Sequence, residues 1–212
     1  MPQVNRPQGL VPIRHLNGSA WNGQYQQFYV PATDATAIYI GDPVKITGTS
    51  GAAGVFVSGV SVEGVATVAR DTSGTTGQDT VGVVVGFAPN PAVNGPSSNV
   101  KHRAASTAAV AYVVTDPTVV YEVQEDAVTT PIASTSVFLN AALNTAAGST
   151  TTGLSGMMID SDTVATTAAL PIKVLGLSKR VDNALSTGTT DFAKWEVMFN
   201  TGAYAPNIAG LA

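Results

Sequence analysis

The chain contains no cysteine. Disulfide bonds, thiolate catalysis and cysteine-based zinc sites are therefore excluded. Charge is also scarce, because charged residues make up 11% of the 212 residues, compared with about 25% in a typical soluble domain. A surface with so few charges exerts little electrostatic repulsion between neighbouring molecules. This composition favours close packing against other proteins and points to a structural or assembly role rather than to an enzyme.

Basic residues are few and scattered. The ten lysines and arginines are outnumbered by 14 acidic residues, which gives a formal net charge of −4. The basic clusters are short, at residues 101–103 and 179–180. Nucleic-acid binding requires a basic face, so we expect no nucleic-acid partner. The same argument excludes polybasic attraction to a membrane.

Long apolar runs are missing as well. A transmembrane helix needs about 18 or more consecutive apolar residues, and no such stretch occurs. Residues 1–6 also lack the charged start and apolar run of a signal peptide. We therefore expect no membrane partner, and synthesis in a cytoplasm.

Groups suited to catalysis are rare. The histidines, His15 and His102, lie in no pattern that places them against a serine and a carboxylate, so we interpret both as surface or interface residues. Carboxylates gather in residues 122–126 and 160–162, where Asp-Ser-Asp lacks the glycine and glutamate that complete a calcium loop. We predict a solvated loop there, although sequence separation leaves a carboxylate pair of the glycosidase type open. No phosphate-binding glycine motif is present, and the sequence predicts no catalytic residue, cofactor or metal ligand.

The segments that are present favour β-structure. Short runs rich in valine, threonine and aromatics alternate with glycine, proline and aspartate turn signals, which is typical of an all-β sandwich or barrel. We predict strands within residues 24–30, 37–40, 44–47, 55–68, 81–87, 110–115, 119–124, 171–177 and 194–200. The continuous apolar run 81–87 predicts burial on both faces. Residues 131–143 are the best candidate for one short helix. We therefore expect a β-sandwich or barrel, jelly-roll-like, with at most one short helix.

The first 25 residues differ from the rest, with three prolines and two Asn-Gly pairs. This composition predicts an extended N-terminal arm over residues 1–30, followed by an all-β body over 31–200 and a tail over 201–212. Aromatic residues gather near the end of the arm, and strand alternation would separate Tyr25 and Tyr29 from Phe28. They either all belong to the core or include anchors for a partner, a role for which tyrosine and tryptophan are favoured. The candidate interface residues are Arg6, Arg14, Trp21, Tyr25, Phe28 and Tyr29.

Two segments resemble the capsid cement or decoration proteins of tailed bacteriophages. The first is residues 5–48, especially AIYIGDPVK at 37–45. The second is residues 148–200, with GSTTTGLSGMMID at 148–160, VATTAALPIKVLGL at 164–177 and KWEV at 194–197. The second segment is the more specific, and the two together cover nearly half of the chain.

The resemblance implies a non-enzymatic virion component with a β-sandwich or jelly-roll-like body. Such proteins sit on the outer surface of an icosahedral head and bridge neighbouring major capsid subunits, and many are dimers or trimers. The implied partners are the major capsid protein and further copies of the chain, and the implied location is the outer surface of the capsid. We expect residues 1–30 to form much of the contact.

An alternative is a carbohydrate- or receptor-binding module of the head-fibre type. All-β folds with exposed aromatic residues often bind sugars, but the two tryptophans, Trp21 and Trp195, are far apart in the sequence. A small hydrolase on a β scaffold is a further alternative, which a cleft holding a histidine near a carboxylate would support. The major shell protein itself needs a long helix and more chain than is present here.

Overall fold

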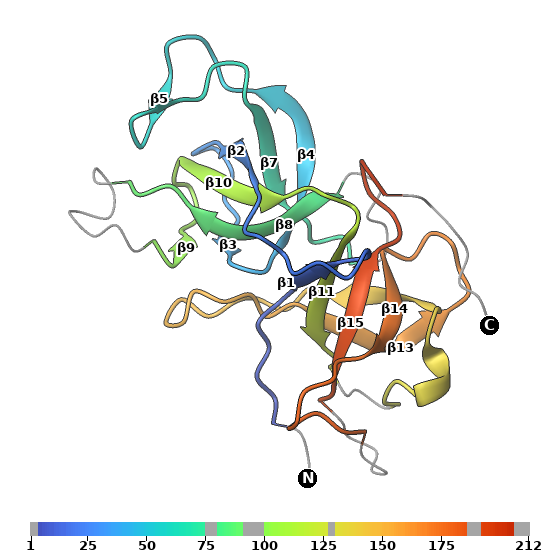
Figure 1. Cartoon of the computed structure of the whole chain (residues 1–212). Coiled ribbons are helices and arrows are strands. Elements are labelled where there is room, and N and C mark those ends of the chain that lie inside the picture. Colours follow the sequence, from blue (N-terminus) through green and yellow to red (C-terminus); the bar gives the residue numbers. More distant parts are fainter. Residues whose placement is uncertain (1–3, 75–79, 91–99, 127–129, 186–191, 206–212) are drawn as a thin grey trace.

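The computed structural model describes residues 4–74, 80–90, 100–126, 130–185 and 192–205. Within these ranges the chain forms short β-strands and a single 3₁₀ turn, η1 (Ser134–Ser136). The prediction of an all-β fold with at most one short helix is confirmed. Most strands belong to two bodies, a closed barrel and a six-stranded sheet, which pack against each other (Figure 1).

Five strands close the barrel in the order β10, β2, β7, β4, β8. Their bounds are Ala109–Val114 (β10), Gln26–Val30 (β2), Ala66–Arg70 (β7), Pro43–Ser50 (β4) and Thr80–Phe87 (β8). Neighbouring strands are antiparallel except β2 and β7, which are parallel. Closure removes the free strand edges that an open sheet would expose. Two phenylalanines, Phe28 and Phe87, and a set of valines and alanines fill the interior.

The second body is a sheet in the order β1, β11, β15, β14, β12, β13. Its strands are Val11–His15 (β1), Val119–Gln124 (β11), Lys194–Phe199 (β15), Ile172–Leu177 (β14), Asn140–Asn144 (β12) and Met158–Ala165 (β13). Side chains alternate along a strand with a period of two. In β15 this places Trp195, Val197 and Phe199 in the core, and turns Lys194 and Glu196 to the opposite face.

Strand β8 lies between the two bodies. Val81 and Val84 belong to the barrel interior, whereas Val83 belongs to the core of the six-stranded sheet. Val114 of the neighbouring strand β10 also packs into the sheet core. The predicted burial of this apolar run on both faces is therefore confirmed, and β8 holds the barrel against the sheet.

Two short pairs complete the fold. Strand β3 (Ile38–Tyr39) pairs with β9 (His102–Arg103). Strand β5 (Phe56–Val57) pairs with β6 (Val60–Ser61) in a hairpin between β4 and β7, which projects away from the barrel in Figure 1. We call residues 51–65 the projecting lobe. Its Phe56 is 67% exposed.

The N-terminal segment differs from the predicted free arm of residues 1–30. Strand β1 pairs with β11 and forms one edge of the sheet, and β2 is part of the barrel. Leu10 is 1% exposed in the sheet core. Pro12 is accommodated because proline fits an edge strand, where its missing N–H costs no ladder bond. The segment is extended as expected, but its described part is built into the body.

The other end of the chain also differs from a loose tail. The described residues end at Ala205, so most of the predicted tail 201–212 lies outside them. Thr201 is fully buried. The Ala203 N–H donates a hydrogen bond of 2.8 Å to the Thr80 carbonyl. Residues 201–205 therefore pack on the start of β8.

The helix expected over residues 131–143 is absent, and that prediction is wrong. Only the 3₁₀ turn η1 forms there, and β12 follows it between β13 and β14. Phe138 has a φ of 67°, which a helix cannot include, and its N–H donates to the Val174 carbonyl at 2.7 Å. Ala141 and Leu143 enter the sheet core. Tertiary pairing here overrides the helical propensity of an alanine-rich run.

The loop expected at the Asp160-Ser161-Asp162 sequence is also wrong, because these residues belong to strand β13. Ser161 is buried, and both its N–H and its hydroxyl donate to the Asp126 carboxylate. The Asp160 pKa is raised, chiefly because burial disfavours its charge and also because Asp126 lies near. The acidic segments 122–126 and 160–162 are therefore in contact, through Asp126 and Ser161.

A buried turn joins the barrel to the sheet, and we call residues 39–43 the Gly41–Asp42 junction. The Gly41 carbonyl accepts from the Leu10 N–H at 3.0 Å. A Cβ at Gly9 would lie 2.4 Å from that same carbonyl oxygen, and Gly9 has a φ of 69°. Ile40 exchanges backbone hydrogen bonds with residues 153–155. Three separate parts of the chain are therefore in direct backbone contact.

Asp42 is the polar centre of this junction and is 0% exposed. Its carboxylate accepts from the Ser155 hydroxyl at 2.5 Å and from the Tyr39 N–H at 2.8 Å. Arg70 Nε lies 3.0 Å away in a buried ion pair. Burial raises the Asp42 pKa, while Ser155, Arg70 and the Tyr39 amide act in the opposite direction. A buried carboxylate with these partners is well compensated.

Candidate functional site

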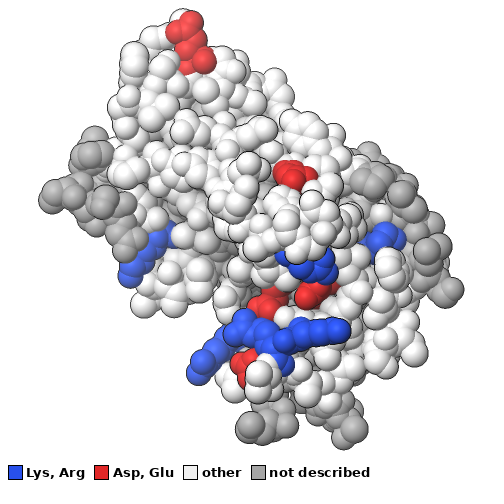
Figure 2. Space-filling model, in the orientation of Figure 1, with Lys and Arg blue, Asp and Glu red and all other residues white. Residues whose placement is uncertain are grey.

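One surface of the six-stranded sheet collects charged side chains. Arg14 Nη2 lies 2.6 Å from Glu196 Oε2. Glu122 lies 2.9 Å from Arg180 and 3.7 Å from Lys194. Figure 2 shows acidic and basic side chains gathered in this region, surrounded by largely uncharged surface. We call Arg6, Arg14, Glu122, Arg180, Lys194 and Glu196 the charged face.

The pairing of β11 with β15 explains why cations gather here. Glu122 and Glu196 are direct partners across the two strands, and like charges placed opposite each other are destabilising. Arg14, Lys194 and Arg180 neutralise this pair. The charge of Glu122 raises the Arg180 pKa. The two predicted interface residues Arg6 and Arg14 both lie in this region.

Arg6, like Arg180, is an exposed member of the charged face. Its backbone N–H donates to Gln124 Oε1 at 2.9 Å, and the Gln124 amide donates to Asn5 Oδ1 at 2.8 Å. The side chain of Gln124 thereby holds the N-terminal segment against β11. This hydrogen bond holds the Arg6 backbone in place, while Arg6 remains exposed to solvent.

A second surface is a groove rich in tyrosine. It is open, has a volume of about 720 Å³, and is lined by Gln24, Tyr25, Gln26, Thr115, Asp116, Pro117 and Tyr204. The Tyr25 ring stacks on Tyr112 with centroids 4.4 Å apart and planes at 26°. Tyr25 and Tyr204 are 48% and 55% exposed. We call this region the tyrosine groove.

Asp116 is the charged residue of the tyrosine groove. Its carboxylate accepts from the Thr118 N–H and hydroxyl, both at 2.8 Å, and His15 Nδ1 lies 3.1 Å away. Burial acts to raise the Asp116 pKa, but the bonds from Thr118 and the proximity of His15 outweigh it, so the pKa is lowered. Asp116 therefore keeps its negative charge under mildly acidic conditions.

The lowered Asp116 pKa predicts acid sensitivity. A depressed carboxylate pKa adds stability above the ordinary value of 3.8, and this stability is lost as the pH falls through the folded-state value. We expect wild type to be more stable than Asp116→Asn at about pH 6, and the difference to shrink at about pH 2.5. Urea unfolding of both proteins at the two pH values measures it. A difference that does not change with pH would contradict the assignment.

A small cavity lies behind the tyrosine groove and shares Thr115, Asp116, Pro117 and Tyr204 with its wall. Its volume is about 10 Å³. Tyr121 also lines it and is 1% exposed. The Tyr121 hydroxyl has no hydrogen-bond partner among the residues that the structure describes. Burial, with a further contribution from Asp116, raises the Tyr121 pKa, so this hydroxyl stays protonated and can donate.

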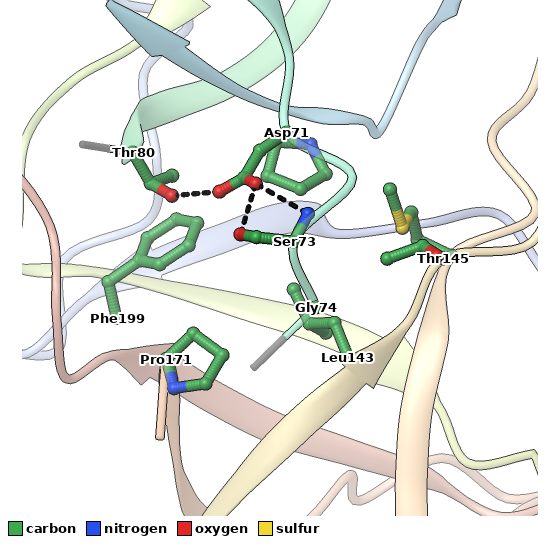
Figure 3. Close-up of a pocket in the computed structure, with 10 residues that line it drawn as sticks. Asp71, Ser73, Gly74, Thr80, Leu143, Thr145, Pro171 and Phe199 are labelled. Atoms are coloured by element: carbon green, nitrogen blue, oxygen red, sulfur yellow. Dashed lines mark hydrogen bonds between the residues drawn. The ribbon is translucent and has the colours of Figure 1, made fainter. Parts of the chain in front are cut away.

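A separate enclosed cavity between barrel and sheet has no room for a ligand. Its volume is about 10 Å³, and Figure 3 shows Asp71 among its polar lining groups. The Asp71 carboxylate accepts from the Ser73 N–H at 2.9 Å, from the Ser73 hydroxyl at 2.5 Å and from the Thr80 hydroxyl. These bonds satisfy the polar groups internally. We therefore interpret this cavity as part of the packing between the two bodies.

The remaining predicted interface residues are less accessible. Phe28 is 6% exposed inside the barrel, so its prediction as a contact residue is wrong for this structure. Tyr29 packs on the outer side of the barrel, in a cluster that includes Val57 and Val62 of the projecting lobe. This separation of Phe28 from Tyr29 follows the predicted alternation. Trp21 is half-buried against the sheet core.

The histidines and carboxylates do not converge on one site. His15 contacts Asp116, whereas His102 stacks on Tyr39 with centroids 5.2 Å apart. Within the described ranges no group of three or more histidine and acidic side chains is placed to hold a metal ion. The same ranges contain no helix long and apolar enough to cross a bilayer.

The groove contains residues that the sequence did not single out. Asp116-Pro117 reads as a turn, Tyr112 as a strand residue and Tyr204 as part of a tail, so no local signal connects them. Tyr25 and Tyr112 stack although they are 87 positions apart in the chain, and only strand pairing between β2 and β10 brings the two segments together.

In comparisons with known proteins, no family model, no curated protein and no solved structure matches this chain.

Proposed function

We propose that this chain is a capsid decoration protein that binds the outer surface of a tailed-phage head and bridges major capsid subunits. The observation that carries the proposal is the contact between the two segments of the phage-protein resemblance. Residues 37–45 and 148–160 lie more than 100 positions apart, yet they are in contact at the Gly41–Asp42 junction. Two segments that resemble one protein family and also pack against each other are what a shared fold would produce.

The charged face is our candidate for the contact with the shell. The chain has only ten lysines and arginines, and Arg6, Arg14, Arg180 and Lys194 lie together on this face. Charges at an interface favour the correct partner and orientation because the opposing surface must carry a complementary pattern. The proposal therefore requires an acidic patch on the shell subunit, and binding that weakens as salt increases.

Bridging requires a second contact region, and the projecting lobe supplies one. It extends from the barrel, away from the six-stranded sheet (Figure 1). Phe56 is one of the most exposed large apolar residues of the described chain. Exposed aromatic side chains are favoured anchors at protein interfaces. Two contact regions on one rigid body allow each copy to touch neighbouring subunits, and many weak contacts then add up over a shell.

Co-sedimentation with heads tests the proposal. Heads of the phage that encodes the chain, purified without it, are mixed with wild type or with Arg6→Glu. We expect wild type to pellet with heads, and Arg6→Glu to bind about tenfold more weakly, which is about 1.4 kcal/mol. Arg6→Glu is preferable to deletion of residues 1–20, because deletion would remove β1 and Leu10 from the sheet.

Lys101→Glu is the matched control. Lys101 is an exposed cation outside the charged face, beside β9, and its side chain makes one hydrogen bond to the Thr151 carbonyl. The variant has the same change in net charge and should bind as wild type does. Failure of wild type to pellet with heads would overturn the function. Equal binding by wild type and both variants would overturn the charged face as the contact.

A further inference from the structure

We propose that the tyrosine groove binds a neutral carbohydrate, as a second activity independent of attachment to a capsid. The inference begins with its exposed rings. Tyr25 and Tyr204 both line the groove and expose about half of their surface. Apolar aromatic faces bordered by polar groups suit the C–H faces and hydroxyls of a sugar ring. The groove is also large enough, since ligand sites usually measure about 300–1,000 Å³.

The Tyr25 ring is held in place before any ligand arrives. Its stack on Tyr112 fixes the plane of the ring, because the two centroids lie 4.4 Å apart. Tyr112 is anchored in β10 and is half-buried. A side chain that is already ordered loses little conformational entropy on binding. Tyr25 therefore presents a preorganised flat surface to the groove.

The polar groups of the groove favour a neutral ligand. Asp116 supplies acceptor oxygens, and Gln24 and Gln26 supply both donors and acceptors. None of the described residues that line the groove is a lysine or arginine. An anionic ligand would meet the negative charge of Asp116 without a compensating cation in the lining. A polyhydroxyl ligand, in contrast, can donate to Asp116 and exchange hydrogen bonds with both glutamines.

The Tyr121 hydroxyl is a further hydrogen-bond donor next to the groove. It is a buried donor without a partner among the described residues, in a cavity that shares its wall with the groove. An unpaired buried polar group is costly, so native proteins rarely retain one. A cavity of about 10 Å³ has room for about one water molecule. That water would connect Tyr121 to a sugar hydroxyl at the Asp116 side of the groove.

Binding of neutral oligosaccharides by the isolated protein tests the inference. The probes are maltohexaose, cellohexaose, chitohexaose and mannohexaose, each titrated by calorimetry, with heparin as an anionic comparison. We expect measurable binding of at least one neutral probe and none of heparin. Tyr25→Ala and Tyr204→Ala should each weaken that binding by about tenfold, because each removes a stacking surface. Tyr25→Phe keeps the ring and should bind within about twofold of wild type.

Phe56→Ala is the control variant, because it removes an aromatic ring that is more exposed than Tyr25 or Tyr204 from the projecting lobe. It should leave sugar binding unchanged. Absence of binding to all four neutral probes would overturn the inference, as would equal binding by wild type and Tyr25→Ala. Since no capsid takes part in this measurement, its failure leaves the decoration proposal intact. If the protein failed to bind heads, the sugar titrations would still test binding at the tyrosine groove.

Discussion

Replacing Asp42 by alanine is expected to lower the free energy of unfolding by about 3–5 kcal/mol, because it leaves the buried Arg70 charge without its partner. Arg70 is 8% exposed and lies 3.0 Å from the Asp42 carboxylate. The Ser155 hydroxyl and the Tyr39 N–H also lose their acceptor. These groups join the barrel to the sheet, so the change should weaken the contact between the two bodies as well as the local turn.

Urea unfolding monitored by tryptophan fluorescence measures this effect, because Trp195 lies in the sheet core. Asp182→Ala is the matched control, since it breaks an ion pair with Arg180 in which the Asp182 side chain is 77% exposed. Exposed pairs add little, so the control should stay within about 0.5 kcal/mol of wild type. Equal stability of Asp42→Ala and Asp182→Ala would contradict the role given to the junction.

Replacing Arg103 by alanine is expected to cost about 4 kcal/mol, for a related reason. Arg103 is 1% exposed. Its guanidinium donates to the carbonyls of Pro31 at 2.8 Å, Asp34 at 2.7 Å, Thr36 at 2.5 Å and Thr107 at 2.7 Å. Alanine would remove a donor from each of these carbonyls and create a cavity, although the Pro31 and Asp34 carbonyls keep a backbone partner. The loop that links β2 to β3 should therefore lose its main anchor.

Arg103→Lys separates charge from geometry. A lysine keeps the positive charge but cannot reach four carbonyls arranged around a planar guanidinium. We expect this variant to fall between wild type and Arg103→Ala in thermal unfolding. Lys101→Ala removes an exposed cation two positions away and should change stability by less than about 0.5 kcal/mol. A Lys101→Ala effect as large as that of Arg103→Ala would contradict a specific role for the buried guanidinium.

Asp42, Arg70 and Arg103 show where a chain with so few charged residues places some of them. Asp42, Arg70 and Arg103 are buried where loops and bodies meet, and each has several polar partners. Six further charged residues form the charged face, and much of the surface is left uncharged (Figure 2). Such a surface has little desolvation cost when it packs against another protein. The distribution of charge is thus consistent with the proposed adhesive role.

The all-β class and many of the strands were readable from the sequence. The valine-rich run at 81–87 indicated burial on both sides, and β8 indeed supplies Val81 to the barrel and Val83 to the sheet. The sequence also predicted a strand within residues 194–200, where polar and apolar residues alternate, and Trp195 on it is buried. The position of Trp195 follows the period-two geometry of a single strand. Val81 and Val83 are two positions apart and yet face different cores, because the register of β8 shifts against its neighbouring strands.

The partners of each strand were not readable in this way. The N-terminal segment looked like a free arm because its prolines and Asn-Gly pairs are compatible with either an arm or an edge strand. Residues 131–143 looked helical because Val137, Phe138 and Ala141 would share one helical face, yet residues 140–144 pair with β13 and β14. Division into a closed barrel and an open sheet, rather than a sandwich, likewise depends on which strands pair.

The same distinction between local pattern and strand pairing applies to the candidate sites. Composition determined that the surface is poor in charge, and local alternation separated Phe28 from Tyr29. Only the tertiary structure placed Arg14 beside Glu196, stacked Tyr25 on Tyr112, and brought Asp116 and Tyr204 into the same groove. The physical reason is range: a side chain's face is set by its own strand, whereas its neighbours are set by pairing and packing between segments far apart in the chain.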